Sequence, residues 1–136
     1  MSTIFSQIIA GELPCFKVYE DERVLAFLDI NPIQPGHTLI IPKVFSENGL
    51  AATAEDLAAL ITVGQKIGNV LINIVGCDGV NFLMNNGEAA GQKIFHTHLH
   101  VIPRFTEDGV WDEPIAGEYE NGEAMELAVA IQKELS

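Results

Sequence analysis

Three of the four histidines in this 136-residue chain alternate along one short segment. His96, His98 and His100 are separated by single residues. Alternate side chains of a strand point to the same face, so we expect the three imidazoles on one face, about 6–7 Å apart. His37 begins another predicted strand, and if the two strands are neighbours, all four rings line one cleft.

Such a cluster admits two chemistries. Imidazole is partly neutral near pH 7, so it can serve as a nucleophile or a proton donor. Three histidines at this spacing can instead ligate zinc. Two features count against zinc: the loop 86–92 offers Glu88 but no clear second ligand, and its glycines favour presenting backbone amides to an anion. A lone histidine on a strand is usually only a satisfied polar residue, but that does not explain three on one face.

The surrounding sequence predicts strands and helices that position this cluster. Alternating and short apolar runs predict strands over 16–19, 24–29, 37–41, 80–85 and 95–104. Helices are expected over 5–11, over 54–74 with Thr53 as its cap, and over 118–135, where the pair 121–122 can delay the start. Tight turns between consecutive strands favour antiparallel pairing, and the helices must then cover the sheet, which predicts an α+β domain.

The helix over 54–74 contains two glycines. Gly64 and Gly68 each cost about 1 kcal/mol relative to alanine in a helix interior. We therefore expect a neighbouring element to approach this helix closely at these positions.

Composition restricts the classes of partner. The net charge of −12 argues against non-specific nucleic-acid binding, although a local site of backbone amides and imidazoles can still hold a small phosphate. No apolar run approaches about 18 residues, so no membrane span is expected, and residues 1–10 do not resemble a signal peptide. Cys15 and Cys77 fit no metal or redox spacing, so we expect reduced thiols and a cytoplasmic protein.

Residues 96–102 resemble the signature of the histidine-triad (HIT) family, His-φ-His-φ-His-φ-φ, where φ is apolar; Thr97 departs slightly from it. Segments 4–14, 27–30 and 35–43, together with Asn85 and 91–92, are also similar to the family, so the likeness runs from about 4 to 104. The resemblance implies a single HIT domain over 1–136, with a core of about 4–104 and a C-terminal extension over 105–136. The implied α+β fold has about five antiparallel strands, one long central helix, a short N-terminal helix and a C-terminal helix.

The resemblance also implies an activity. The expected protein is a nucleotide phosphohydrolase or nucleotidyl transferase that cleaves at the α-phosphate of a purine nucleoside phosphoramidate or dinucleoside polyphosphate. His98 is the implied nucleophile, and its other ring nitrogen is expected to bond the backbone carbonyl of His96. His100 and His37 are expected to contact phosphate oxygens, and His96 to orient its neighbours. The alternatives are a purine-nucleotide-binding regulatory protein with incidental hydrolysis, and a metal-dependent enzyme with the histidines as ligands.

The family pattern implies further nucleotide contacts. The phosphate side is expected to involve Asn85, Gly91, Gln92, Lys93 and Ile94. Asp29 is expected to accept hydrogen bonds from the ribose, and the base to enter a slot of Phe5, Ile8, Leu13, Phe27 and Ile30. Each has a structural alternative: Asp29 could form a turn, the apolar residues could be core, and the two amides could serve the loop.

The resemblance finally implies partners. We expect a homodimer formed through the helix 54–74 and the edge strand before the triad. No cofactor and no metal are expected, although a divalent cation such as Mg could assist with polyphosphate substrates. Because Cys15 lacks a second nearby cysteine, no structural zinc is expected. Some relatives that cleave phosphoramidates have serine where this chain has Lys93, so the leaving group stays open.

Overall fold

A computed structural model describes residues 3–111 and 116–136 of the chain. Its elements in chain order are α1 (Ile4–Ile9), β1 (Lys17–Glu20), β2 (Val24–Leu28), β3 (Thr38–Pro42), α2 (Ala54–Ile74), β4 (Gly79–Leu83), a 3₁₀ turn (Glu88–Ala90), β5 (Leu99–Arg104) and α3 (Glu123–Leu135). The chain therefore contains the five strands and the long helix that the sequence predicts.

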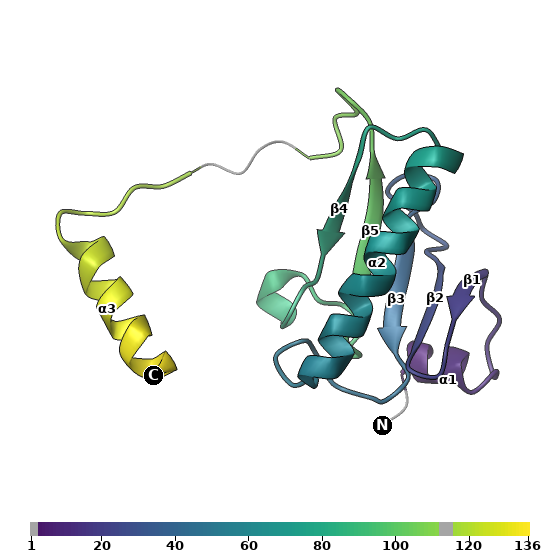
Figure 1. Cartoon of the computed structure of the whole chain (residues 1–136), viewed down its shortest axis with the longest axis horizontal. Helices are drawn as coiled ribbons and strands as arrows, with labels where there is room; N and C mark the ends of the chain where they lie inside the picture. Colours follow the sequence, from purple (N-terminus) through teal and green to yellow (C-terminus); the bar gives the residue numbers. More distant parts are fainter. Residues whose placement is uncertain (1–2, 112–115) are drawn as a thin grey trace.

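The strands form one antiparallel sheet in the order β1-β2-β3-β5-β4, with β1 and β4 at its edges (Figure 1). β3 and β5 are neighbours, and Leu39 lies opposite His100. The expected α+β architecture, with five antiparallel strands and one long central helix, is confirmed.

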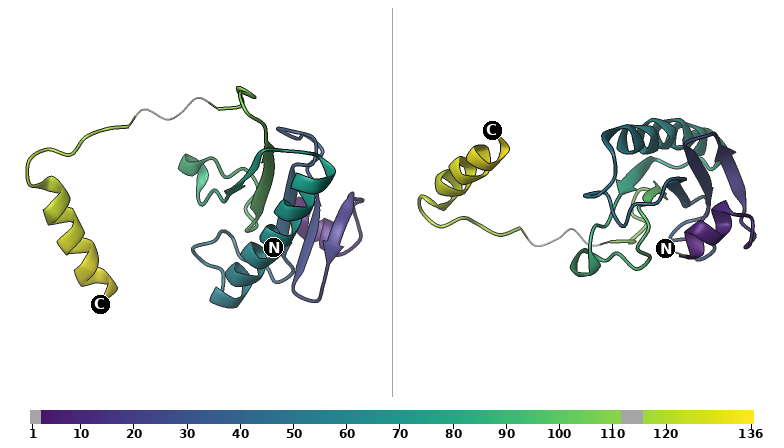
Figure 2. Two further views of the ribbon diagram at one scale, coloured as in Figure 1. Left: turned by 45° about the horizontal axis from the view of Figure 1, so that its top comes forward. Right: turned by 90° about the horizontal axis from the view of Figure 1, so that it is seen from below.

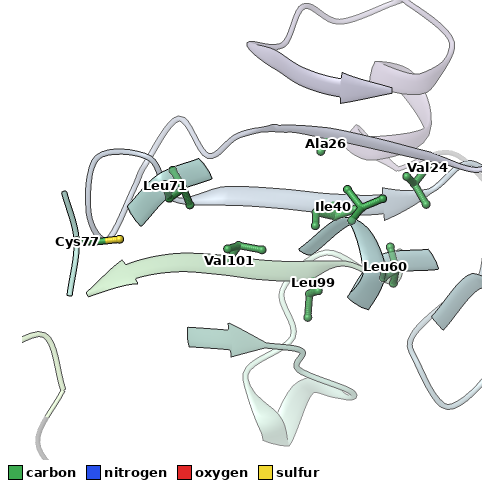
Figure 3. Close-up of a cluster of buried hydrophobic side chains, with 9 residues drawn as sticks. Val24, Ala26, Ile40, Leu60, Leu71, Cys77, Leu99 and Val101 are labelled. Carbon is green, nitrogen blue, oxygen red and sulfur yellow. The ribbon is translucent and has the colours of Figure 1, made fainter. Parts of the chain in front are cut away.

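The two faces of the sheet pack on different helices. α2 covers one face, and a buried cluster that includes Val24, Ile40, Leu60, Leu99 and Val101 fills the space between them (Figure 3). On the other face, near α1, a second cluster holds Phe5, Leu25, Phe27, Leu39 and Ile41. Successive residues of β2 and β3 point to opposite faces of the sheet, so one set enters the cluster under α2 and the other enters the cluster near α1.

The helix glycines mark a close approach, as expected. A Cβ at Gly64 would lie 3.1 Å from Cδ2 of Leu99, and a Cβ at Gly68 would lie 3.3 Å from Cγ2 of Val80. α2 therefore lies directly on β4 and β5. This contact fixes the position of β5, the strand that contains His100.

Most predicted boundaries lie within two residues of those in the structure, and two are wrong by more than that. The strand expected over 95–104 begins only at Leu99, because the amide of Thr97 donates to the carbonyl of Ser46, after β3, at 2.9 Å instead of pairing with a neighbouring strand. The terminal helix begins at Glu123 rather than 118. Gly122 precedes it with a φ of 85°, a conformation that favours glycine and interrupts a helix.

α3 lies apart from the sheet, beyond its β4 edge, in all three views (Figures 1 and 2). All residues from Glu123 to Leu135 are exposed. α2 is long and apolar enough by length and composition to cross a membrane, yet its inward stripe packs on the sheet, and the core helix of a globular domain meets the same criteria. A membrane span therefore does not explain the exposed apolar residues of α2 and α3.

The close approach at Gly64 makes a prediction about stability. Gly64→Val should lower the free energy of unfolding by roughly 1–3 kcal/mol, because the added methyls overpack against Leu99. Gln65→Val, at the adjacent exposed position, is the control and should change it by less than about 0.5 kcal/mol. Urea unfolding of both variants measures the difference, and equal stabilities would show that α2 and β5 are not tightly packed.

Candidate active site

The structure gathers all four histidines in one cluster on the α1 side of the sheet. The ring centroids of His98 and His100 are 5.0 Å apart, and those of His100 and His37 are 5.1 Å apart. The ring of Phe5 contacts His98 edge-on at 5.1 Å and His96 at 6.0 Å. The sequence spacing predicts this cluster, although only His100 lies in a regular strand.

His98 has one ring nitrogen fixed by the backbone. Its Nδ1 lies 2.7 Å from the carbonyl oxygen of His96, and because a carbonyl only accepts, Nδ1 carries the proton. The Nε2 of the neutral ring then holds a free lone pair. The side chain is 7% exposed. The hydrogen bond expected between these two residues is therefore present.

His96 anchors the segment from the opposite direction. Its Nε2 donates to the carbonyl of Pro42 at 3.0 Å, which leaves Nδ1 to accept from the hydroxyl of Thr3 at 3.4 Å. The ring is fully buried and also meets the edge of Phe45 at 5.5 Å. These contacts fix the orientation of His96 itself, and its expected role of orienting its neighbours stays a prediction.

His37 and His100 form a directed pair. The backbone amide of Ile33 donates to Nδ1 of His37 at 3.1 Å, so Nε2 of His37 carries the proton. This Nε2 donates to Nδ1 of His100 at 2.9 Å, and the remaining proton of neutral His100 is on Nε2. The sequence interpretation placed His37 directly on phosphate oxygens. Both ring nitrogens of His37 therefore already have hydrogen-bond partners within the chain, and its contact with phosphate stays a prediction.

Burial holds the rings neutral. It is the main cause that lowers the pKa of His37, His96 and His98 below the usual histidine value. Burial, with the neighbouring His98 and His37, lowers the pKa of His100 to about 4. At pH 7 the cluster thus offers one imidazole with a free lone pair beside one with a free N–H.

Three groups come close enough together to suggest a cation site. One ligand atom each from Asp29, His37 and His100 lie within 4.8 Å of one another. The hydrogen bonds argue against coordination, because a cation on Nε2 of His37 would need the lone pair of that nitrogen. Moving its proton to Nδ1 would place two donors face to face at the amide of Ile33. The donor chemistry therefore favours a proton-ordered cluster over a metal centre.

The expected ribose and base residues are divided between core and surface. Asp29 serves a turn through Oδ1, which accepts from the amide of Asn31 at 2.9 Å, while Oδ2 lies 3.7 Å from Nε2 of His37. Phe5 and Phe27 are buried in the cluster under α1, with Ile8 packed against it. The remaining two slot residues lie on the surface: Leu13 is 37% exposed and Ile30 is 76% exposed.

The loop before the histidines is held by side-chain amides. Gln92 was expected to face phosphate, but its Oε1 accepts from the amide of Gly87 and its Nε2 donates to the carbonyls of Glu47 and Ile94. These hydrogen bonds hold the loop against the neighbouring backbone, and the contact of Gln92 with phosphate stays a prediction. Asn85 is near the same loop, with Nδ2 3.5 Å from the carbonyl of Gly91.

The last two phosphate-side residues differ in burial. Lys93 is exposed, and Ile94 is half-buried against the cluster under α1. Both residues lie between Gln92 and the histidine segment, and the contact of their backbone groups with a ligand stays a prediction.

Sequence reasoning missed several supporting residues. The hydroxyl of Thr97 pairs with that of Ser46 at 2.6 Å, which holds the histidine segment against the chain after β3. The departure of Thr97 from the apolar pattern was the available signal, since a buried hydroxyl needs a partner. No signal identified Thr3 or the amide of Ile33.

Comparisons with known proteins agree with this geometry. The HIT domain family model matches residues 10–107. The chain is 45% identical over 108 residues to Adenylylsulfatase HINT3 of Arabidopsis thaliana. This match covers 79% of this chain and 55% of that protein. A crystal structure of a HIT family protein from Bacillus anthracis is 41% identical with a TM-score of 0.89, and the match covers 98% of this chain and 96% of the other. That match necessarily extends into α3.

A second crystal structure, of a hypothetical histidine triad nucleotide-binding protein from Sulfolobus tokodaii, is 39% identical with a TM-score of 0.73. It covers 96% of this chain and 89% of the other chain. Sequence identities of 39–45% over most of this chain indicate common ancestry in addition to a shared fold.

The lowered pKa values predict a pH-dependent stability. The unfolded chain protonates its histidines near pH 6.5, whereas folded His100 does so near pH 4. Stability from these neutral rings is complete above about pH 6.5 and is lost as the pH falls toward 4. The free energy of unfolding should therefore decrease between pH 7 and pH 5, where most carboxyl groups stay ionised.

His100→Gln tests this assignment, because glutamine does not titrate. Urea unfolding at pH 7 and pH 5 should show a smaller decrease for the variant than for the unsubstituted chain. The same decrease in both proteins would mean that His100 is not held neutral by folding.

Proposed function

This chain belongs to the histidine-triad (HIT) family of nucleotide-binding proteins, and from that premise we propose that it cleaves nucleotides at the α-phosphate through a covalent nucleotidyl-histidine on His98. The substrate class is a purine nucleoside phosphoramidate or a dinucleoside polyphosphate. The relative named adenylylsulfatase supports a hydrolytic activity in this family.

One observation carries the proposal: Nδ1 of His98 is tied to the carbonyl of His96 at 2.7 Å, which leaves Nε2 as a neutral nucleophile. Nε2 attacks the α-phosphorus, a P–N bond forms, and the bond to the leaving group breaks with its electron pair. A water molecule then attacks phosphorus, loses its proton and releases the nucleoside monophosphate from Nε2. Division of one displacement into two steps is the advantage of a covalent intermediate.

His100 supplies the complementary group. Its Nε2–H is free to donate because His37 occupies Nδ1. A preorganised donor beside the nucleophile stabilises negative charge on the phosphate oxygens in the transition state. His37 is a positioning residue in this scheme, since it sets the direction of the donor without contacting the substrate.

The nucleoside binds beside this pair. Oδ2 of Asp29 is turned toward the cluster and can accept hydrogen bonds from ribose hydroxyls, while its Oδ1 stays with the turn. The half-buried Ile8 packs on the buried Phe5 and Phe27 beside the cluster and can contribute apolar surface to a purine. No metal takes part in the displacement; Mg²⁺ would act only by neutralising a polyphosphate leaving group.

Covalent labelling tests the nucleophile. The chain should become labelled on mixing with adenosine 5′-phosphoramidate carrying radioactive α-phosphorus, and quenching under alkaline conditions preserves the acid-sensitive P–N bond. His98→Asn should abolish the label and lower kcat by at least about 10³-fold, because the nucleophile is absent.

His37→Gln is the matched control. This variant keeps His98, so it should still label, but with a lower kcat because the donor orientation of His100 is lost. Label that persists in His98→Asn would exclude the proposed nucleophile. Nucleotide binding without any label in the unsubstituted chain would instead support the regulatory alternative.

We also propose that the chain forms a homodimer through α2 and β4. β4 is an edge strand, and the exposed fraction of its Phe82 is 44%. On α2, Ile61 and Ile72 are 50% and 43% exposed and share a side with Gly68, which packs on Val80 and Phe82. These apolar groups border the free edge, where a second copy would extend the sheet and bury them.

Sedimentation velocity at micromolar concentration tests the dimer. The unsubstituted chain should sediment as a dimer, and Ile72→Glu should shift it toward monomer because a charge enters the apolar contact. Asn73→Glu introduces the same charge on the adjacent exposed position and should leave the dimer intact. A monomeric unsubstituted chain would refute the proposal.

A further inference from the structure

α3 carries an apolar stripe with no partner in its own chain's sheet. Five residues share one side of the helix by their spacing: Ala124, Leu127, Ala128, Ile131 and Leu135. The exposed fractions of Leu127 and Ile131 are 47% and 50%, and that of Leu135 is 82%. A helix of 13 residues is marginal in water by itself, so a helix with such a stripe requires packing against another surface.

The body of the chain offers a matching apolar groove. It has a volume of about 460 Å³ and runs between the second half of α2 and the sheet. Six apolar side chains contribute to its lining: Val18, Leu28, Ile67, Val70, Leu71 and Ile74. Val70 and Ile74 remain 49% and 78% exposed there. The groove therefore presents apolar surface that the folded chain leaves uncovered.

We propose that α3 of each copy docks, through its apolar stripe, into the α2 groove of a second copy of this chain. The arrangement exchanges equivalent helices between protomers, so one two-fold axis generates two identical contacts. The proposal extends the dimer proposed above and gives the C-terminal extension 105–136 a defined partner surface.

The position of the two surfaces favours exchange. The groove lies on the β1–β2 side of α2, whereas α3 lies beyond β4, at the opposite edge of the sheet (Figures 1 and 2). A copy joined at the β4 edge would lie on the same side as α3. The helix is therefore directed toward the second copy and away from its own groove.

Charge supports the same pairing. Lys66 lines the polar margin of the groove, and Glu123 and Glu134 flank the apolar stripe of α3 by helical spacing. Attraction between this basic residue and the two acidic residues would fix the orientation of a docked helix. Its contribution to the affinity would be smaller. The groove consequently fits an acidic amphipathic helix, and the chain contains one.

Disulfide trapping between two different copies tests the exchange. One copy carries Val70→Cys and the other carries Ile131→Cys, both with Cys15→Ser and with tags of different size; Cys77 is buried and is kept. The full-length chains are co-expressed and oxidised mildly. Lys133→Cys, on the opposite side of α3 from the stripe, replaces Ile131→Cys in the control.

The mixed disulfide should form roughly ten-fold faster with Ile131→Cys than with Lys133→Cys, because docking raises the effective concentration of the paired thiols. Equal rates would overturn the proposal. A disulfide formed mainly within one chain that carries both substitutions would also overturn it, because α3 would then occupy its own groove. If the chain still sediments as a dimer and still labels on His98 in either case, only the helix exchange has failed.

Discussion

The hydrogen bond from Nδ1 of His98 to the carbonyl of His96 constrains the rest of the site. In a regular strand that carbonyl would point toward a neighbouring strand, so the bond requires the chain to leave the sheet just before β5. His96 and Thr97 compensate by bonding to Pro42, the last residue of β3, and to Ser46, which follows that strand. Because residues 96–98 leave the regular strand, Nδ1 of His98 can bond this carbonyl, and Nε2 of the same ring keeps a lone pair in a fixed direction.

Four buried imidazoles would be costly if their polar atoms lacked partners. Here backbone groups fix three of them: the carbonyls of His96 and Pro42 accept, and the amide of Ile33 donates. Because a carbonyl and an amide impose opposite tautomers, His98 presents a lone pair while His100, set through His37, presents an N–H. Fixed backbone dipoles, rather than charges, therefore arrange an acceptor beside a donor.

The sequence predicts the parts that depend on local periodicity. Alternation and caps give every strand and helix, and the spacing of His98 and His100 places both on one face. The positions of the Gln92 amide and of the His37 ring depend on hydrogen bonds to Glu47 and Ile33, and no local pattern encodes those partners. The start of β5 fails for the same reason, because long-range bonds compete with strand pairing there.

β5 separates two tasks. Leu99 and Val101 point into the core under α2, and His100 points to the opposite face. The packing of α2 on β5 therefore sets the distance of this strand from the helix, and with it the position of the N–H group of His100. The histidines lie on the face of the sheet away from α2, and both flanks of α2 keep exposed apolar residues. In the proposed dimer, association through α2 would stabilise the strand from behind without obstructing the histidines.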